Sequence, residues 1–148
     1  MAPEGVIIRE LGVHTDERGW LAELFRDDET DFSPAMAYVS MTGPGIARGP
    51  HEHLDQSDFF CFFGNFRLYL WDNRKGSPLY GKRFELDTKG KPVTVIVPPR
   101  VVHAYKNIGP KEGLVLNMPD RLYKGRGKTD PVDEVRYEND PGSPFRIA

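Results

Sequence analysis

The chain has 148 residues, 20 of them Lys or Arg against 22 Asp or Glu, and a net charge of −2. This balance argues against nucleic-acid binding, which needs a basic face, but it allows a few basic side chains around a small anion in one pocket. The longest apolar run, residues 59–63, is far shorter than the roughly 20 residues that cross a membrane, and the start of the chain lacks a signal-peptide pattern. With a single cysteine, Cys61, the composition predicts a cytoplasmic protein without disulfides.

Short apolar segments alternate with turn residues along the whole chain, which contains 15 Gly and 13 Pro residues. The predicted strands are residues 6–9, 20–25, 35–41, 58–63, 66–71, 80–86, 93–97, 101–105 and 114–118. Residues 58–63 are almost all apolar, typical of a strand covered on both faces, whereas residues 66–71 alternate. No window shows a helical period. We therefore expect one all-β domain, residues 1–148, built as an antiparallel sandwich or barrel.

Two polar stretches are expected to be structural rather than functional. The tail from about residue 119 is irregular, with four basic residues close together (Arg121, Lys124, Arg126 and Lys128), and we interpret it as a solvated loop. Asp72 and Arg74 are expected to form a local ion pair that holds a hairpin.

Histidines are the residues most indicative of chemistry. His14 lies among turn residues and is expected to be exposed. His51 and His53 are two apart, so an extended chain points both to one face. His103 lies in a second segment, residues 98–107, and in a small sandwich the two segments can face each other across one mouth. Half-buried imidazoles need hydrogen-bond partners. The chain offers Gln56, Asp58 and Asn107.

These two segments resemble the two sequence motifs of the cupin family. The first is His-x-His followed by a polar residue and Gly64, and the second runs from Pro98 through His103 to Asn107. Arg100 stands where the cupin pattern has Gly, and Gln56 or Asp58 stands where it has Glu. The resemblance implies a cupin double-stranded β-helix, a jelly-roll barrel with a pocket at one end.

Longer blocks resemble the dTDP-4-dehydrorhamnose 3,5-epimerase family. In the family's order they are residues 16–19 with Leu21, Glu23 and Phe25, then residues 48–51, 70–81, 98–103 and 139–141. The resemblance implies an isomerase without metal or other cofactor, a homodimer, that epimerises a nucleotide-linked 4-keto-6-deoxy sugar by proton abstraction next to the keto group.

The same resemblance assigns roles to individual residues. It makes His51 the base, a role that suits an imidazole because its ordinary pKa is about 6.5, and Asp140 the carboxylate that orients it. The implied substrate contacts are Arg18 to the pyrophosphate, Glu23 to the nucleotide base, Arg48 to an oxyanion or phosphate, His103 near the keto oxygen, and His53 and Gln56 in the same pocket.

Two positions depart from the family pattern. The family's tyrosine acid is missing from residues 114–118, so Tyr105, two residues from His103, and Tyr38 are the candidate acids. The family's lysine falls near Asp58. Both departures favour single over double epimerisation.

Three alternatives remain at this stage. Arg48, His51 and His53, with Tyr38 upstream, also resemble sugar 3,4-ketoisomerases, which move the ketone instead of inverting a carbon. A metal-binding cupin would use His51, His53, Gln56 and His103 as ligands, although Arg48 and Arg100 nearby disfavour a dication. The third is a non-catalytic binder of sugar nucleotides.

Overall fold

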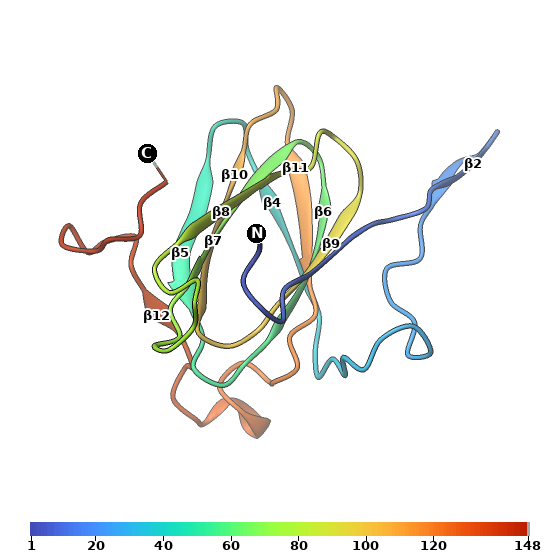
Figure 1. The fold of residues 1–148 in the computed structure, drawn as a ribbon. Helices are drawn as coiled ribbons and strands as arrows, with labels where there is room; N and C mark the ends of the chain where they lie inside the picture. Colours follow the sequence, from blue (N-terminus) through green and yellow to red (C-terminus); the bar gives the residue numbers. More distant parts are fainter. Residues whose placement is uncertain (148) are drawn as a thin grey trace.

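The computed structural model describes residues 1–147, and its regular secondary structure consists almost entirely of β-strands (Figure 1). Two five-stranded sheets face each other as a barrel. The first has the order β1 (Ile7–Glu10), β9 (Val93–Val97), β6 (Asp58–Phe63), β11 (Gly113–Asn117) and β4 (Tyr38–Thr42). The second has the order β12 (Val135–Arg136), β5 (Ala47–Glu52), β10 (Val101–Asn107), β7 (Phe66–Asp72) and β8 (Arg83–Asp87). The expected all-β jelly-roll barrel is confirmed.

The core lies between the two sheets because successive side chains of a strand point to opposite faces. On β7, Phe66, Leu68 and Leu70 point into the barrel, and the alternation predicted for this segment is confirmed. The outward-facing Tyr69 and Trp71 are also buried, because the C-terminal segment with Phe145 packs over them. The second sheet is therefore covered on both faces near its centre.

β5, which carries the histidine pair, is missing from the predicted strands. Its sequence contains Gly49 and Pro50, which are typical of turns, and proline has no N–H for a strand ladder. Pro50 is tolerated because β12, the strand on the outer side of β5, has only two residues and needs few hydrogen bonds from β5. The Pro50 carbonyl still accepts a hydrogen bond from the Tyr137 N–H. β5 therefore forms because it pairs with neighbouring strands, and not because its own residues favour a strand.

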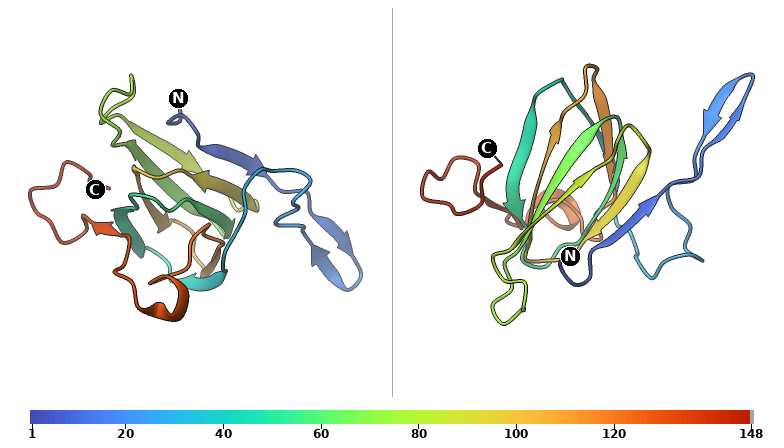
Figure 2. Two further views of the ribbon diagram at one scale, coloured as in Figure 1. Left: turned by 90° about the horizontal axis from the view of Figure 1, so that it is seen from below. Right: turned by 45° about the horizontal axis from the view of Figure 1, so that its top comes forward.

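The segment predicted as a strand over residues 20–25 is shorter than expected. Only Gly19–Leu21 forms a strand, β3, which pairs with β2 (His14–Asp16). This hairpin, hereafter the arm, projects away from the barrel (Figure 2). Trp20 and Leu21 on it are about 60% exposed.

The tail is irregular, as expected, apart from β12 and the 3₁₀ turn η1 (Arg126–Lys128). The local ion pair between Asp72 and Arg74 is confirmed: Arg74 Nε and Nη2 donate to the Asp72 carboxylate at 2.8 and 2.9 Å, and Ser77 adds a third hydrogen bond. Among residues 1–147, no helix has the length and apolar character needed to cross a membrane.

Candidate active site

The pairing of β5 with β10 brings the histidines together. His51 and His103 are direct partners in this ladder, and their ring centroids are 4.4 Å apart. His53 follows β5 directly, with its ring centroid 5.8 Å from that of His51 and 5.7 Å from that of His103. The two histidine segments thus meet at one place on the barrel.

Gly49 permits this close approach of the two strands. Its φ of +84° lies in the region that side chains rarely adopt. A Cβ at this position would lie 2.6 Å from the His103 carbonyl oxygen and 3.2 Å from His51 Nδ1. Any larger residue would therefore push β5 away from β10 and separate the two rings.

Asp58, at the start of β6, is a buried carboxylate shared by two of the histidines. Its Oδ2 lies 3.0 Å from His53 Nε2 and 3.3 Å from His103 Nε2. Its Oδ1 accepts hydrogen bonds from the side-chain amides of Gln56 and Asn117, each at 2.9 Å. Burial opposes ionisation of Asp58, but the interactions with His103 and His53 outweigh it and lower the pKa of the carboxyl. Asp58 is therefore ionised at neutral pH.

His53 carries the matching positive charge. Burial by itself would lower the pKa of His53, but the hydrogen bond with Asp58 and the Asp58 charge raise it to about 9. On the other side of the ring, Nδ1 donates to the carbonyl of Asp133 in the tail. The Asp133 carboxylate in turn accepts from the backbone N–H groups of residues 54, 55 and 56. The tail thus anchors the loop that follows the histidine pair.

His51 is neutral in the same surroundings. Burial, followed by the effect of His103 and His53, lowers its pKa to about 2. The carboxylate beside it is Glu134 of the tail, whose Oε1 lies 4.0 Å from His51 Nδ1. The structure does not bring Asp140 to His51. Asp140 lies in an exposed turn, where its Oδ1 accepts a hydrogen bond from the Gly142 N–H at 2.9 Å.

A cavity of about 420 Å³ opens in front of His51, and we call it the histidine cavity. Both candidate acids line it: Tyr38, whose hydroxyl accepts a hydrogen bond from Asn117 at 3.0 Å, and the buried Tyr105. Burial raises the pKa of both tyrosines, so each carries a proton at neutral pH. Arg48 also lines the cavity and is held by hydrogen bonds from Nε to Thr42 and from Nη2 to the Met41 carbonyl.

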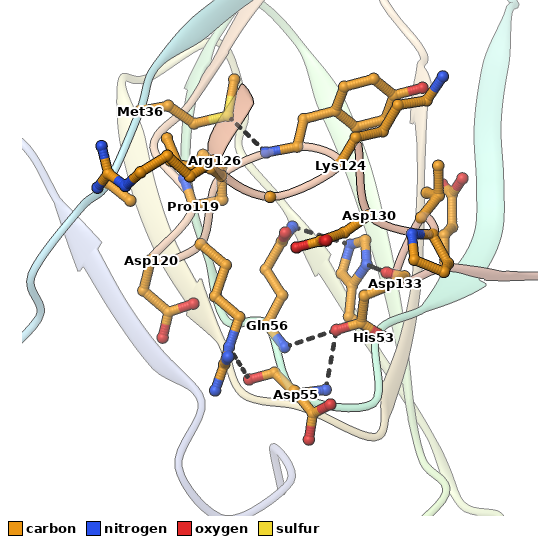
Figure 3. Close-up of a pocket in the computed structure, with 18 of the residues that line it drawn as sticks. Met36, His53, Asp55, Gln56, Pro119, Asp120, Lys124, Arg126, Asp130 and Asp133 are labelled. Atoms are coloured by element: carbon orange, nitrogen blue, oxygen red, sulfur yellow. Dashed lines mark hydrogen bonds between the residues drawn. The ribbon is translucent and has the colours of Figure 1, made fainter. Parts of the chain in front are cut away.

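A second cavity of about 820 Å³ lies between the barrel and the tail (Figure 3), and we call it the tail cavity. Gln56 lines it, and it shares four residues with the histidine cavity: Tyr38, His53, Glu134 and Arg136. The tail is therefore more than the solvated loop that its composition predicts, because it forms a wall beside the histidines.

Arg18 and Glu23 line neither cavity of the single chain. Arg18 is at the tip of the arm, where its side chain is 85% exposed and pairs with Asp16. The Glu23 side chain is 61% exposed and lies 3.9 Å from Arg26.

Some members of the site were anticipated from the sequence and others were not. Asp58 does pair with His53 and Gln56 donates to Asp58, whereas Asn107 instead donates to the carbonyls of Thr42 and Lys111. Asn117 was missed, although an amide at the end of the apolar β11 is a detectable signal. Glu134 was also missed, and no local pattern in the polar tail distinguishes it.

Comparison with known proteins decides the family. The family model described as dTDP-4-dehydrorhamnose 3,5-epimerase matches residues 1–129. The chain belongs to this family. Within it, the chain is 39% identical over 126 residues to the probable low-salt glycan biosynthesis epimerase Agl13 of Haloferax volcanii, covering 80% of this chain and 79% of that one. It is 33% identical over 112 residues to the spore coat polysaccharide biosynthesis protein SpsL of Bacillus subtilis, covering 72% of each.

Solved structures of the epimerase family share the fold. The crystal structure of a dTDP sugar isomerase from Desulfovibrio desulfuricans matches with a TM-score of 0.78 at 24% identity, over 93% of this chain and 87% of that one. The cupin barrel expected from the sequence motifs is thus the fold of this epimerase-family enzyme.

The histidine group of this family member also has the donor types of a metal site. One ring nitrogen from each of His51, His53 and His103 lies within 4.8 Å of the others. Among the described residues, His103 Nε2 has no aligned hydrogen-bond partner, whereas its Nδ1 bonds the Val101 carbonyl. Gln56 is not part of this group of three, and its side-chain amide donates to Asp58 Oδ1 instead. A metal at His53 would have to displace a ring proton whose pKa the neighbouring Asp58 raises to about 9.

Proposed function

We propose that this epimerase-family chain inverts a carbon next to the keto group of a nucleotide-linked 4-keto-6-deoxy sugar, with His51 as the base. The observation that carries the proposal is a half-buried imidazole that shares one cavity with two tyrosines and has the Glu134 carboxylate 4.0 Å from its Nδ1. A base must be free of its proton to act, and an acid on the same cavity must hold one.

In the proposed reaction, a ring nitrogen of His51 takes the proton from the carbon beside the ketone. The electrons of the broken C–H bond move to the keto oxygen and form an enolate. Arg48 and the protonated His53 supply positive charge around this oxygen. Glu134 lies close enough to stabilise the imidazolium that forms on His51.

A tyrosine then returns a proton to the opposite face of the carbon, which inverts its configuration. Tyr38 is favoured, because Asn117 donates a hydrogen bond to its oxygen and so leaves its own O–H free. The tyrosinate is reprotonated from solvent and His51 releases its proton, which completes the cycle.

Proton NMR in D₂O with dTDP-4-keto-6-deoxyglucose tests this proposal. We expect deuterium incorporation next to the ketone together with a new stereoisomer. His51→Asn is expected to slow both by about 10²–10⁴-fold, the usual contribution of a general base. His14→Asn, on the arm, is the matched control. Near-normal exchange by His51→Asn, or no exchange by the parent protein, would contradict the proposal, and the latter would favour a non-catalytic binder.

We further propose that the active form is a homodimer in which the arm carries Arg18 and Glu23 to the site of a second copy. The support is the projecting arm (Figure 2) and a row of exposed apolar side chains on β4 and β11, namely Val39, Met41 and Leu114. Mixing Arg18→Ala with His51→Asn tests it. If the sites are shared, an equal mixture regains active sites, up to about a quarter of the total; no recovery after subunit exchange would contradict it.

A 3,4-ketoisomerase is the second candidate, because His53 lines the histidine cavity together with His51 and Tyr38. An unprotonated His51 and a protonated His53 on one face of the sugar suit proton transfer between adjacent carbons through an enediol, one taking a proton and the other giving one. The same NMR experiment separates the candidates, since a ketoisomerase moves the ketone signal from C4 to C3.

A further inference from the structure

We propose that Asn117 is a positioning residue for the epimerisation: it holds Tyr38 so that this tyrosine, rather than His51, returns a proton to the reacting carbon. The inference rests on the proposed function, because it concerns the acid of that reaction. Asn117 lines neither cavity, so it acts through another side chain and not on the substrate. The structural basis is a buried amide between Tyr38 and the ion pair of Asp58 and His53.

Asn117 ends β11, which lies between β6 and β4 in the first sheet. Its direct partner on β4 is Tyr38, and direct partners in a ladder point to the same face of a sheet. Asn117 is 1% exposed, and a buried amide is stable only where its polar atoms find partners. The partners of this amide therefore show what it is placed to hold.

Both polar atoms of the Asn117 amide are occupied. Oδ1 accepts a hydrogen bond from the Phe59 N–H at 3.1 Å, and since that N–H can only donate, it determines which end of the amide is the oxygen. Nδ2 donates to Asp58 Oδ1 at 2.9 Å and to the Tyr38 hydroxyl oxygen at 3.0 Å. These contacts leave the amide one orientation, with its N–H groups toward Asp58 and Tyr38.

This orientation determines where the Tyr38 proton points. An amide nitrogen can only donate, so the Tyr38 oxygen accepts and its own O–H is directed elsewhere. Tyr38 lines the histidine cavity with His51, so this O–H is available to a ligand there. Burial raises the pKa of Tyr38, and the hydrogen bond from Asn117 lowers it, so Asn117 also makes Tyr38 a better acid.

The ionised Asp58 anchors the Asn117 amide, because a hydrogen bond to a charged acceptor is stronger than one between neutral groups. Asp58 itself is fixed by His53, whose Nε2 lies 3.0 Å from Oδ2. Gln56 donates to the same Oδ1, also at 2.9 Å, and its other neighbour is His53 rather than Tyr38. The two amides therefore support the same carboxylate, and of the two only Asn117 also bonds Tyr38.

The position of Tyr38 matters because the enolate can take a proton on either face. If His51 returns the proton, the C–H bond forms again on the original face and the substrate is recovered, with deuterium where the His51 proton has exchanged with solvent. If Tyr38 donates, its O–H bond breaks, a C–H bond forms on the opposite face, and the tyrosinate is reprotonated by solvent. The ratio of inversion to deuterium incorporation without inversion therefore measures how well Tyr38 is held.

Proton NMR in D₂O with dTDP-4-keto-6-deoxyglucose measures this ratio on the full chain. Asn117→Ala is expected to lower it by about tenfold, which corresponds to about 1.4 kcal/mol, the size of one hydrogen bond. Gln56→Ala is the matched control, since it removes a hydrogen bond from the same Asp58 oxygen and none from Tyr38; its ratio should equal that of the parent. Circular dichroism and thermal unfolding check the fold. Asn117→Val, which suits a strand and also lacks the donor, replaces Asn117→Ala if that variant does not fold.

A second readout comes from combining variants. Because Asn117 acts through Tyr38, Asn117→Ala should reduce inversion no further in the Tyr38→Phe background, whereas a merely structural role would add to the loss. Equal ratios in the parent and Asn117→Ala would overturn the proposal, as would an equal loss in Gln56→Ala or a full additional loss in the Tyr38→Phe background. A parent that exchanges and inverts while Asn117→Ala keeps its ratio refutes only this inference. A parent that exchanges nothing refutes the proposed function, and this inference with it.

Discussion

The Asp58 carboxylate and the His53 ring, on either side of the loop between β5 and β6, form an ion pair with 3.0 Å between Oδ2 and Nε2. Asp58 is 1% exposed and the His53 side chain 12%. The carboxylate thus holds a positive charge on the histidine at this end of the site.

Breaking this pair is expected to destabilise the fold. Asp58→Asn keeps the shape of the side chain but removes the charge that holds the proton on His53, so the free energy of unfolding is expected to fall by about 3 kcal/mol, the value of the shift in pKa from 6.5 to about 9. Urea denaturation followed by fluorescence measures it, with the exposed Asp55→Asn as control. A loss below about 1 kcal/mol would show that the pair contributes little.

His51 and His53 are expected to change the stability of the fold with pH in opposite directions, because their pKa values are shifted in opposite directions. The pKa of His53 is raised from 6.5 to about 9, so its stabilising contribution is complete below pH 6.5 and is lost as the pH rises to about 9. The pKa of His51 is lowered to about 2, so below pH 6.5 the unfolded chain takes up a proton that the folded chain does not, and stability falls. The free energy of unfolding, measured by urea denaturation between pH 5 and 9, is expected to fall less toward alkaline pH in His53→Gln than in the parent. In His51→Asn it is expected to fall less toward acidic pH.

Gly49→Ala is expected to disrupt the site through the backbone. The new Cβ would meet the His103 carbonyl oxygen at 2.6 Å at a positive φ. Strained backbone of this kind costs about 1–3 kcal/mol, and the contact adds to it, so we expect a loss of at least about 2 kcal/mol. Gly12→Ala is the control, since it meets no atom within 4 Å and needs no positive φ. An unchanged melting temperature for Gly49→Ala would contradict this account of the strand pairing.

The tyrosines can be told apart by separating exchange from inversion. Tyr38→Phe is expected to keep deuterium incorporation, which needs only His51, while inversion falls by roughly 10²-fold or more. Tyr105→Phe is the comparison, because it lines the same cavity. If only Tyr105→Phe loses inversion, Tyr105 is the acid and Asn117 has no part in the step.

Metal removal is expected to leave activity intact. A metal at the three-histidine group would have to displace the proton that His53 shares with Asp58, whose pKa is raised to about 9. Dialysis against EDTA should therefore not change the rate of epimerisation. Stoichiometric metal in the purified protein by mass spectrometry, lost on His53→Ala, would contradict this and favour a metal-binding cupin.

Much of the barrel follows from local sequence. The apolar run of residues 58–63 and the alternation of residues 66–71 predict β6 and β7, because a buried face of a strand carries apolar side chains. The His-x-His spacing likewise predicts that His51 and His53 share a side. Such features depend only on neighbouring residues, which is why the sequence determines them by itself.

The composition of the site was decided by contacts over long distances in the chain. β5 becomes a strand through its partners β10 and β12 rather than through its own residues. Asp133 and Glu134 reach the histidines from about 80 positions away, although they lie in a polar tail with no period. The neutral state of His51 and the charge on His53 also arise only when burial and Asp58 act together in space. The local sequence pattern indicates which face of a strand is buried, but it does not indicate which side chain from a distant part of the chain contacts that face.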